Sequence, residues 1–224
     1  FKGFGEPVAV SQVLGISDAV SRFEAQHEHS LAALVGRDGE IESLRELWRK
    51  TCAGSGQVVL ICADPGVGKS RIVAALEHEL PVDRRRMLRH FCSPYHAESP
   101  LHPIVANLTR ACATLPGEDP SARISRLAEL FDLGGASSAQ DLGLLCELLS
   151  WEAGDRVEPF PGSPQQKKSR LFDILYAQLR RSASVEPQLL VFEDAHWADA
   201  TSLELLDGLV KQVATRAMML VITH

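Results

Sequence analysis

The stretch LICADPGVGKSRIV, residues 60 to 73, constrains the fold of this chain more than any other part of the sequence. Apolar residues lead into a glycine-rich turn, and the turn ends in Gly-Lys-Ser. The helical stripe that follows it consists of Ile72, Val73, Leu76 and Leu80. This order is typical of a P-loop, in which a buried strand passes through a turn into a helix. It predicts a site that binds the phosphates of a nucleotide.

The chemistry of phosphate binding explains the residue types in this loop. Backbone N–H groups converge on the β-phosphate, so Gly66 and Gly68 must carry no side chain there. Lys69 supplies a positive charge for the β- and γ-phosphates, and the Ser70 hydroxyl is a magnesium ligand. The usual first glycine of the motif is Ala63 here. A methyl group is tolerated at that position only where φ is negative, so we predict a negative φ for Ala63.

A second motif, QLLVFEDAHWAD, supplies the carboxylates that a magnesium triphosphate requires. Its apolar residues end in Glu193 and Asp194, which places both acids at the carboxyl edge of a parallel sheet. This is a Walker B pattern, and it predicts Glu193 on the metal side and Asp194 as the base that polarises the attacking water. The alternative is that the two acids only cap the next loop. Trp197 is interpreted as a packing residue.

Short apolar runs alternate with helical patterns along the chain. Because these runs are continuous rather than alternating, they predict strands that are buried on both faces. They cover residues 58–62, 87–92, 189–192 and 218–223. The helical stripes are Ile41, Leu44, Leu47 and Trp48; Leu101, Ile104, Val105, Leu108 and Cys112; Ile124, Leu127, Ala128 and Phe131; and Leu171, Ile174, Leu175 and Leu179. The predicted fold class is α/β, a P-loop NTPase three-layer αβα sandwich with a parallel sheet.

Two helix starts carry capping signatures. Ser163 precedes a proline and lies three residues before Gln166, which predicts a Ser cap and a helix that begins directly after it. The run Thr-Ser-Leu-Glu from Thr201 to Glu204 has the pattern of a second capping box. It predicts a helix capped by Thr201.

Composition narrows the classes of partner and compartment. The net charge of -6 argues against a general nucleic-acid binder, which needs a basic face to neutralise phosphates. The one basic run, Arg84 to Arg86 with Arg89, is interpreted as a solvated loop that leads into a strand. No apolar run reaches the ~18 residues of a membrane span. The five cysteines are widely spaced in apolar contexts, which is typical of reduced core thiols. We expect a cytoplasmic protein without nucleic-acid or membrane contacts.

Four motifs occur together in this chain: LVGRDGEIESL, GQVVLICADPGVGKSRIV, FCSPYHAESPLHPI and LLVFEDAHWADATSLELLDGL. Together they resemble the AAA-type ATPase module of the STAND class of signalling NTPases, over nearly the whole chain. The resemblance is closest to the module that follows a class III adenylate/guanylate cyclase domain in multidomain bacterial regulators. Residues 1–14, FKGFGEPVAVSQVL, are similar to the end of such a cyclase domain. The expected domains are a cyclase end at 1–14, a linker at 15–34 and an ATPase domain at 35–224.

The resemblance implies functions for further residues. It places Val35, Gly36 and Arg37 near the adenine, and it makes Thr223 a sensor of the γ-phosphate. The predicted binding residues for ATP and Mg²⁺ are Val35, Gly36, Arg37, Asp64, Pro65, Gly66, Val67, Gly68, Lys69, Ser70, Arg71 and Thr223. The predicted magnesium ligands are Ser70 and Glu193. The predicted catalytic residues are Glu193 and Asp194.

The resemblance also implies a sheet in the order 5-1-4-3-2, of which four strands are visible in the sequence. The domain is therefore expected to be truncated at its C-terminal side, and as a Mg-dependent ATPase it is expected to be slow or inactive. Its expected function is an ATP-binding, ATP-hydrolysing regulatory switch. The expected partners are the adjacent cyclase and C-terminal domains of the same polypeptide, and a second copy of the module. The alternative function is a nucleotide-binding module or scaffold that does not hydrolyse ATP.

Overall fold

A computed structural model describes residues 35–81, 86–113, 119, 121–133, 138–152 and 154–224. The expected cyclase end at 1–14 and the expected linker at 15–34 lie outside these described residues. In chain order the elements are α2 Asp38–Cys52, β1 Gln57–Ile61, α3 Lys69–Glu79, β2 Arg86–Phe91, the 3₁₀ turn η2 Pro94–His96, α4 His102–Ala111, α5 Ala122–Phe131, α6 Ser138–Leu149, η3 Gly154–Arg156, α7 Pro164–Val185, β3 Gln188–Glu193, η4 Ala195–Trp197, α8 Ala200–Val213 and β4 Met218–Thr223.

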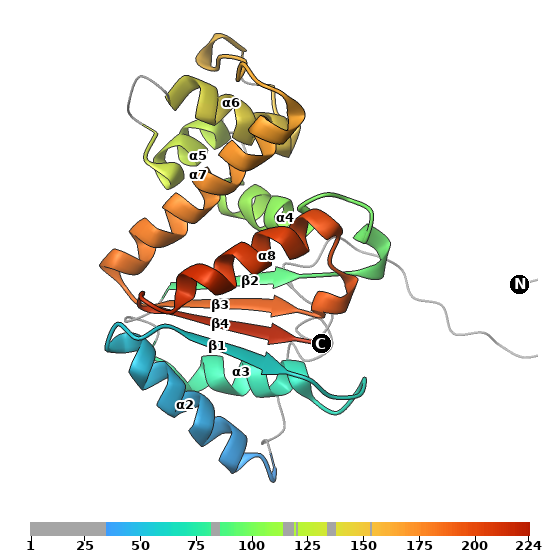
Figure 1. Cartoon of the computed structure of the whole chain (residues 1–224), viewed down its shortest axis with the longest axis vertical. Coiled ribbons are helices and arrows are strands. Elements are labelled where there is room, and N and C mark those ends of the chain that lie inside the picture. Colours follow the sequence, from blue (N-terminus) through green and yellow to red (C-terminus); the bar gives the residue numbers. More distant parts are fainter. Residues whose placement is uncertain (1–34, 82–85, 114–118, 120, 134–137, 153) are drawn as a thin grey trace, which may run out of the picture. The chain divides into compact units, whose positions relative to one another are not determined.

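The four strands form one parallel sheet in the order β1-β4-β3-β2 (Figure 1). Each strand lies within one residue of the apolar run that predicts it, at both ends. The observed order is the 1-4-3-2 portion of the order that the resemblance implies. Because parallel neighbours cannot be joined by a tight hairpin, the chain crosses between strands through helices.

Helices cover both faces of this sheet. One apolar cluster joins α2 and α3 to one face, and its fully buried strand residues are Leu189, Val191, Met219 and Val221. A larger cluster joins α4, α7 and α8 to the opposite face, and its buried strand residues are Leu190, Phe192, Met218 and Leu220. The three-layer αβα sandwich is therefore confirmed (Figure 1). Within the described ranges, no helix is both long and apolar enough to cross a bilayer.

One predicted helix start is confirmed and the other is wrong by two residues. The Ser163 hydroxyl accepts from the Gln166 N–H, and the Gln166 side chain accepts from the Ser163 N–H, which completes a capping box. In α8 the cap is Asp199, whose carboxylate accepts from the N–H of Thr201 at 3.0 Å. Thr201 therefore lies inside the helix, because the aspartate before it is an equally good cap.

The basic run is not a solvated loop in its described part. Arg86 and Arg89 both belong to β2, and Arg89 is buried. Burial of an arginine requires a partner of opposite charge, and Arg89 forms ion pairs with Glu77 and Glu193. The basic run predicted that Arg89 is exposed to solvent. This prediction is wrong because the two carboxylates compensate the charge of the buried guanidinium.

The five cysteines are free thiols, but they do not all lie in the core. Cys92, Cys112 and Cys146 are buried, whereas Cys52 and Cys62 are exposed. The prediction of core thiols is therefore wrong for two of them. Cys52 ends α2 and Cys62 follows the last residue of β1, so both side chains leave the apolar interior at the end of an element.

Candidate nucleotide-binding site

The glycine-rich turn between β1 and α3 has the backbone shape of a phosphate loop. Gly66 and Gly68 have φ values of 84° and 98°, in the left-handed region where a Cβ atom causes strain. Ala63 is not among the described residues with a positive φ, which confirms the prediction for this position. Its methyl group is therefore compatible with the loop. The two glycines are required by their conformation.

The loop ends at the uncapped N-terminus of α3. Gly68 is the N-cap residue, no side chain caps this helix end, and its first turn contains no acidic residue. The first N–H groups of a helix have no partner within the helix, and the aligned peptide dipoles place partial positive charge there. This end of α3 therefore offers donors and positive charge to an anion.

Lys69 adds a full positive charge at the same place. Its Nζ donates to the carbonyl oxygen of Ala63 at 2.7 Å and lies 3.4 Å from the carbonyl oxygen of Asp64. The side chain therefore reaches back across the turn from the first residue of α3. The loop's own carbonyl groups hold the ammonium where a phosphate chain would need a counter-charge.

A cleft of about 400 Å³ opens beside this loop, between α2, β1 and the start of α3. Its volume lies in the range of about 300–1,000 Å³ that is usual for small-molecule sites. Of the residues predicted to bind ATP, Arg37, Val67 and Lys69 line it together. Arg37 forms an exposed ion pair with Glu40 at 2.7 Å. Val35, by contrast, is 86% exposed and is not among the lining residues.

Glu193 ends β3 on the face of the sheet that α3 covers. Alternate residues of a strand point to the same side, so Glu193 shares a face with Leu189 and Val191. Both of these leucine and valine side chains belong to the apolar cluster under α2 and α3. Its side chain is buried, and both the Nε and an Nη of Arg89 donate to its Oε1. Arg89 also donates to Glu77 of α3 at 3.2 Å. The structure therefore places Glu193 in a buried network of one arginine and two glutamates.

The sequence patterns do not predict this network. Arg89 and Glu193 are separated by 104 residues, and Arg89 stands in a basic run that gives no sign of burial. The position of Arg89 within a predicted strand is the one feature of the sequence that could have indicated its burial. A charged residue inside a strand of a doubly covered sheet needs a buried partner.

Asp194 and Thr223 bring two further strand ends to the same edge. The Asp194 N–H donates to the Thr223 hydroxyl at 2.9 Å, and Thr223 is fully buried beside Ile61 at the end of β1. Asp194 has a φ of 54°, a conformation that costs a residue with a side chain about 1 kcal/mol or more. Its carboxylate forms no cap bond to the turn η4. The predicted base thus sits at a strained turn, tied to the predicted sensor.

Two other residues lie shortly after strands of this sheet, Cys92 after β2 and Trp197 after β3. Burial raises the pKa of the Cys92 thiol to about 12, and the negative charges of Asp199 and Asp194 add to the shift. Cys92 is therefore a neutral thiol at pH 7, not a nucleophile. The ring of Trp197 lies beside that of His196, with 5.0 Å between the ring centroids, and the residue is 43% exposed, so its packing is partial.

Comparison with known proteins identifies similar chains. Residues 33–222 match the family model described as AAA ATPase domain. The uncharacterized protein R02095 of Rhizobium meliloti (strain 1021) is 32% identical over 226 residues, which cover 99% of this chain and 21% of that protein. The chain thus spans about a fifth of the length of this curated relative. Among solved structures, Cdc6p from Pyrobaculum aerophilum is similar with a TM-score of 0.45 and 16% identity, over 87% of this chain and 40% of that chain.

Proposed function

The chain belongs to the AAA ATPase domain family, and on this premise we propose that it is an ATP-binding and ATP-hydrolysing switch module. One observation carries the proposal. The ammonium of Lys69 lies on a loop with two left-handed glycines, at an uncapped helix start and at the edge of a cleft of about 400 Å³. Charge, donors and space for a nucleotide are therefore assembled at one point.

The proposed binding mode follows from the residues around this point. Lys69 and the N–H groups of the loop hold the β- and γ-phosphates, and the cleft beside Arg37 takes the nucleoside. Ser70 and Glu193 are the proposed magnesium ligands. When bound, Mg²⁺ neutralises part of the charge on the triphosphate. The donor set fits this ion, because hydroxyl and carboxylate oxygens are the ligands that magnesium prefers.

Arg89 restricts which oxygen of Glu193 can hold the metal. Both hydrogen bonds from the guanidinium go to Oε1. The proposal therefore assigns Oε2 to magnesium and Oε1 to Arg89. In this arrangement Arg89 is a positioning residue, which fixes the carboxylate without touching the nucleotide.

Asp194 is the proposed base. A carboxylate at this position accepts a proton from the attacking water, and typical losses on removing such a base are about 10²- to 10⁴-fold in rate. Thr223 is the proposed γ-phosphate sensor. Its hydroxyl oxygen accepts from the Asp194 N–H and still has its own proton to donate. A change at the γ-phosphate would thereby reach the turn that carries Asp194.

The wider setting is also part of the proposal. We place the module in the STAND class of a cytoplasmic signalling protein, next to a class III nucleotide cyclase domain. Its partners are then the neighbouring domains and a second copy of the module, rather than nucleic acid or membrane. The four motifs quoted above support this placement.

Single-turnover phosphate release separates hydrolysis from binding alone. The full-length protein, in excess over radiolabelled Mg-ATP, is expected to release phosphate, and Asp194→Asn is expected to slow release at least 100-fold while ATP still binds. The matched control is Asp207→Asn, an exposed aspartate of α8 that pairs with Lys211. This control should leave the rate unchanged. If the wild-type protein binds ATP and releases no phosphate, the module is a binding domain only.

A further inference from the structure

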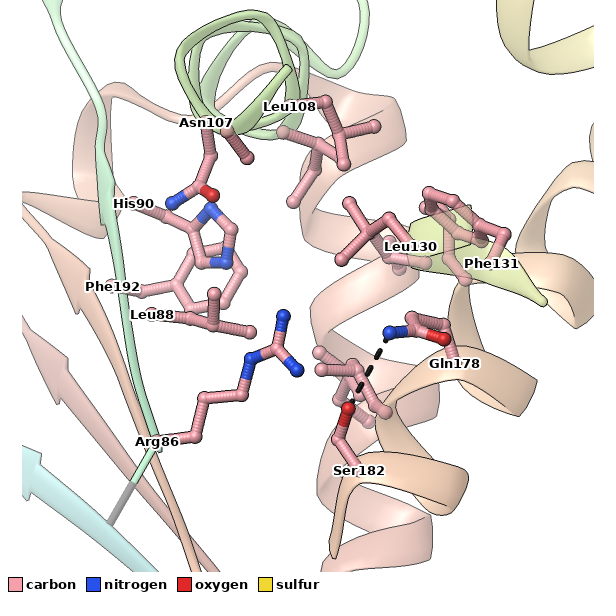
Figure 2. Close-up of a pocket in the computed structure, with 16 residues that line it drawn as sticks. Arg86, Leu88, His90, Asn107, Leu108, Leu130, Phe131, Gln178, Ser182 and Phe192 are labelled. Atoms are coloured by element: carbon pink, nitrogen blue, oxygen red, sulfur yellow. Dashed lines mark hydrogen bonds between the residues drawn. The ribbon is translucent and has the colours of Figure 1, made fainter. Parts of the chain in front are cut away.

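A second cavity, of about 80 Å³, lies on the face of the sheet opposite to α3 (Figure 2). Strands β2 and β3 contribute residues on one side of it, and α4, α5, α7 and α8 contribute the others. Its walls are mainly apolar and include Leu88, Leu108, Phe131, Leu175, Phe192 and Leu209. Because the candidate nucleotide site uses α3 and the other face, this cavity is a separate feature of the molecule.

Arg86 brings a positive charge into these apolar surroundings. It is the first residue of β2 and shares a face with Leu88 and His90, since alternate strand residues point to the same side. Figure 2 shows its guanidinium pointing into the cavity. In the described part of the chain no carboxylate pairs with Arg86, and no lining residue is acidic. On the opposite face of the same strand, Arg89 has two carboxylates.

The other polar groups near the cavity already have partners. The Nδ1 of His90 lies 3.3 Å from the carbonyl oxygen of Pro103, and the Nδ2 of Asn107 donates to the carbonyl oxygen of Arg89 at 2.8 Å. Burial lowers the pKa of His90 to about 4, so its ring is neutral at pH 7. Arg86 is therefore the group that sets the charge of a ligand.

We propose that this cavity binds a short-chain monocarboxylate, with the carboxylate on the Arg86 guanidinium and the alkyl chain against the apolar wall. A guanidinium presents two parallel N–H donors that match a carboxylate, and apolar surroundings strengthen the attraction. The volume of about 80 Å³ limits the length of the alkyl chain. A ligand of a few carbon atoms fits, whereas a long-chain fatty acid does not. The inference goes beyond the proposed ATPase function and does not depend on it.

Butyrate, titrated into the nucleotide-free protein and followed by amide NMR shifts, tests the inference. Saturable shifts are expected at β2 and α7. Butyramide has the same shape without the charge and is expected to bind at least tenfold more weakly. Arg86→Met, which removes the guanidinium but keeps an unbranched side chain, is expected to weaken butyrate binding at least tenfold. The matched control is Arg180→Met, whose guanidinium contacts Gln212 and does not line the cavity; it should change the affinity less than twofold.

The melting temperature provides a second measurement. Arg86→Met replaces a charge in apolar surroundings, so without butyrate the variant is expected to melt at or above the wild-type temperature. Butyrate should raise the melting temperature of the wild-type protein only. The inference is overturned by an absence of saturable butyrate binding, by equal binding of butyramide, or by an unchanged butyrate affinity in folded Arg86→Met. If the variant does not fold, the comparison of butyrate with butyramide on the wild-type protein decides.

Discussion

Arg89 is the residue on which the geometry of the predicted acids depends. Its guanidinium lies between Glu77 and Glu193, and its own side chain and that of Glu193 are almost completely shielded from solvent. Taking charges out of water is costly, and each charge in the group is tolerated because of the others. The network therefore ties Glu193, the last residue of β3, through Arg89 to Glu77 of α3.

Arg89→Met should consequently be strongly destabilising. The substitution leaves two buried glutamates without this cation, and breaking a buried pair in this way typically costs about 3–5 kcal/mol in the free energy of unfolding. Urea denaturation measures this loss. The matched control is Arg45→Met on α2, because Arg45 also pairs with two glutamates, Glu42 and Glu79, but on the surface. The control should lose little or no stability, and equal losses would contradict the account.

For single residues, the sequence predicts a function where all residues of a site belong to one continuous motif. Gly66, Gly68 and Lys69 follow from one continuous motif, because the loop itself forms the phosphate site. The partners of Arg86 and Arg89 could not be predicted in this way. These arginines stand three residues apart on opposite faces of one strand, and only the packed sheet decides that one meets carboxylates and the other an apolar cavity.

Among the elements, the strands and most helices are predictable because each carries a clear apolar pattern. The continuous runs that form β1 to β4 reflect burial on both faces of the sheet. Helix α6 is not predicted by the sequence. Its buried residues are spread over several sides of the helix, so they form no single apolar stripe. One of them is Asp141, which pairs with Arg170 of α7 at 2.6 Å. Such a residue reads as solvent-exposed in the sequence.

Helix α8 packs closely against Tyr176 of α7, and this contact predicts the effect of a substitution at Gly208. A Cβ atom added at Gly208 would lie 2.0 Å from the hydroxyl oxygen of Tyr176, which donates to the carbonyl oxygen of Leu205 at 2.9 Å. Gly208→Ala is therefore expected to destabilise the protein by about 1–3 kcal/mol, as overpacked cores do. Urea midpoints measure the change.

The control for Gly208 is Gly39 in α2. A Cβ atom added there meets no atom within 4 Å, so Gly39→Ala should stabilise the protein by up to about 1 kcal/mol through helix propensity alone. The two substitutions are chemically identical and should have opposite signs. If Gly208→Ala also stabilised the protein, this would contradict the close contact between α8 and Tyr176.

In the molecule as a whole, the parallel sheet brings motifs that are far apart in the sequence together at one site. The carboxyl ends of β1, β4 and β3 lie side by side, so the glycine-rich loop, Thr223 and the pair Glu193 and Asp194 meet at one edge. This convergence was predictable from the strand pattern and the order of the motifs. The shape of the cleft under α2 and the cavity beside Arg86 were not, because both depend on how helices pack over the sheet.

Calorimetric titration with Mg-ATP tests the central claim most directly, namely that the loop at the start of α3 binds the phosphates of a nucleotide. The wild-type chain is expected to bind Mg-ATP with a dissociation constant in the micromolar range, and Lys69→Ala is expected to lose this binding. Lys211→Ala, which removes an exposed lysine of α8, is the control and should bind as the wild type does. Equal binding by the wild-type and Lys69→Ala proteins, or no binding by either, would contradict the account.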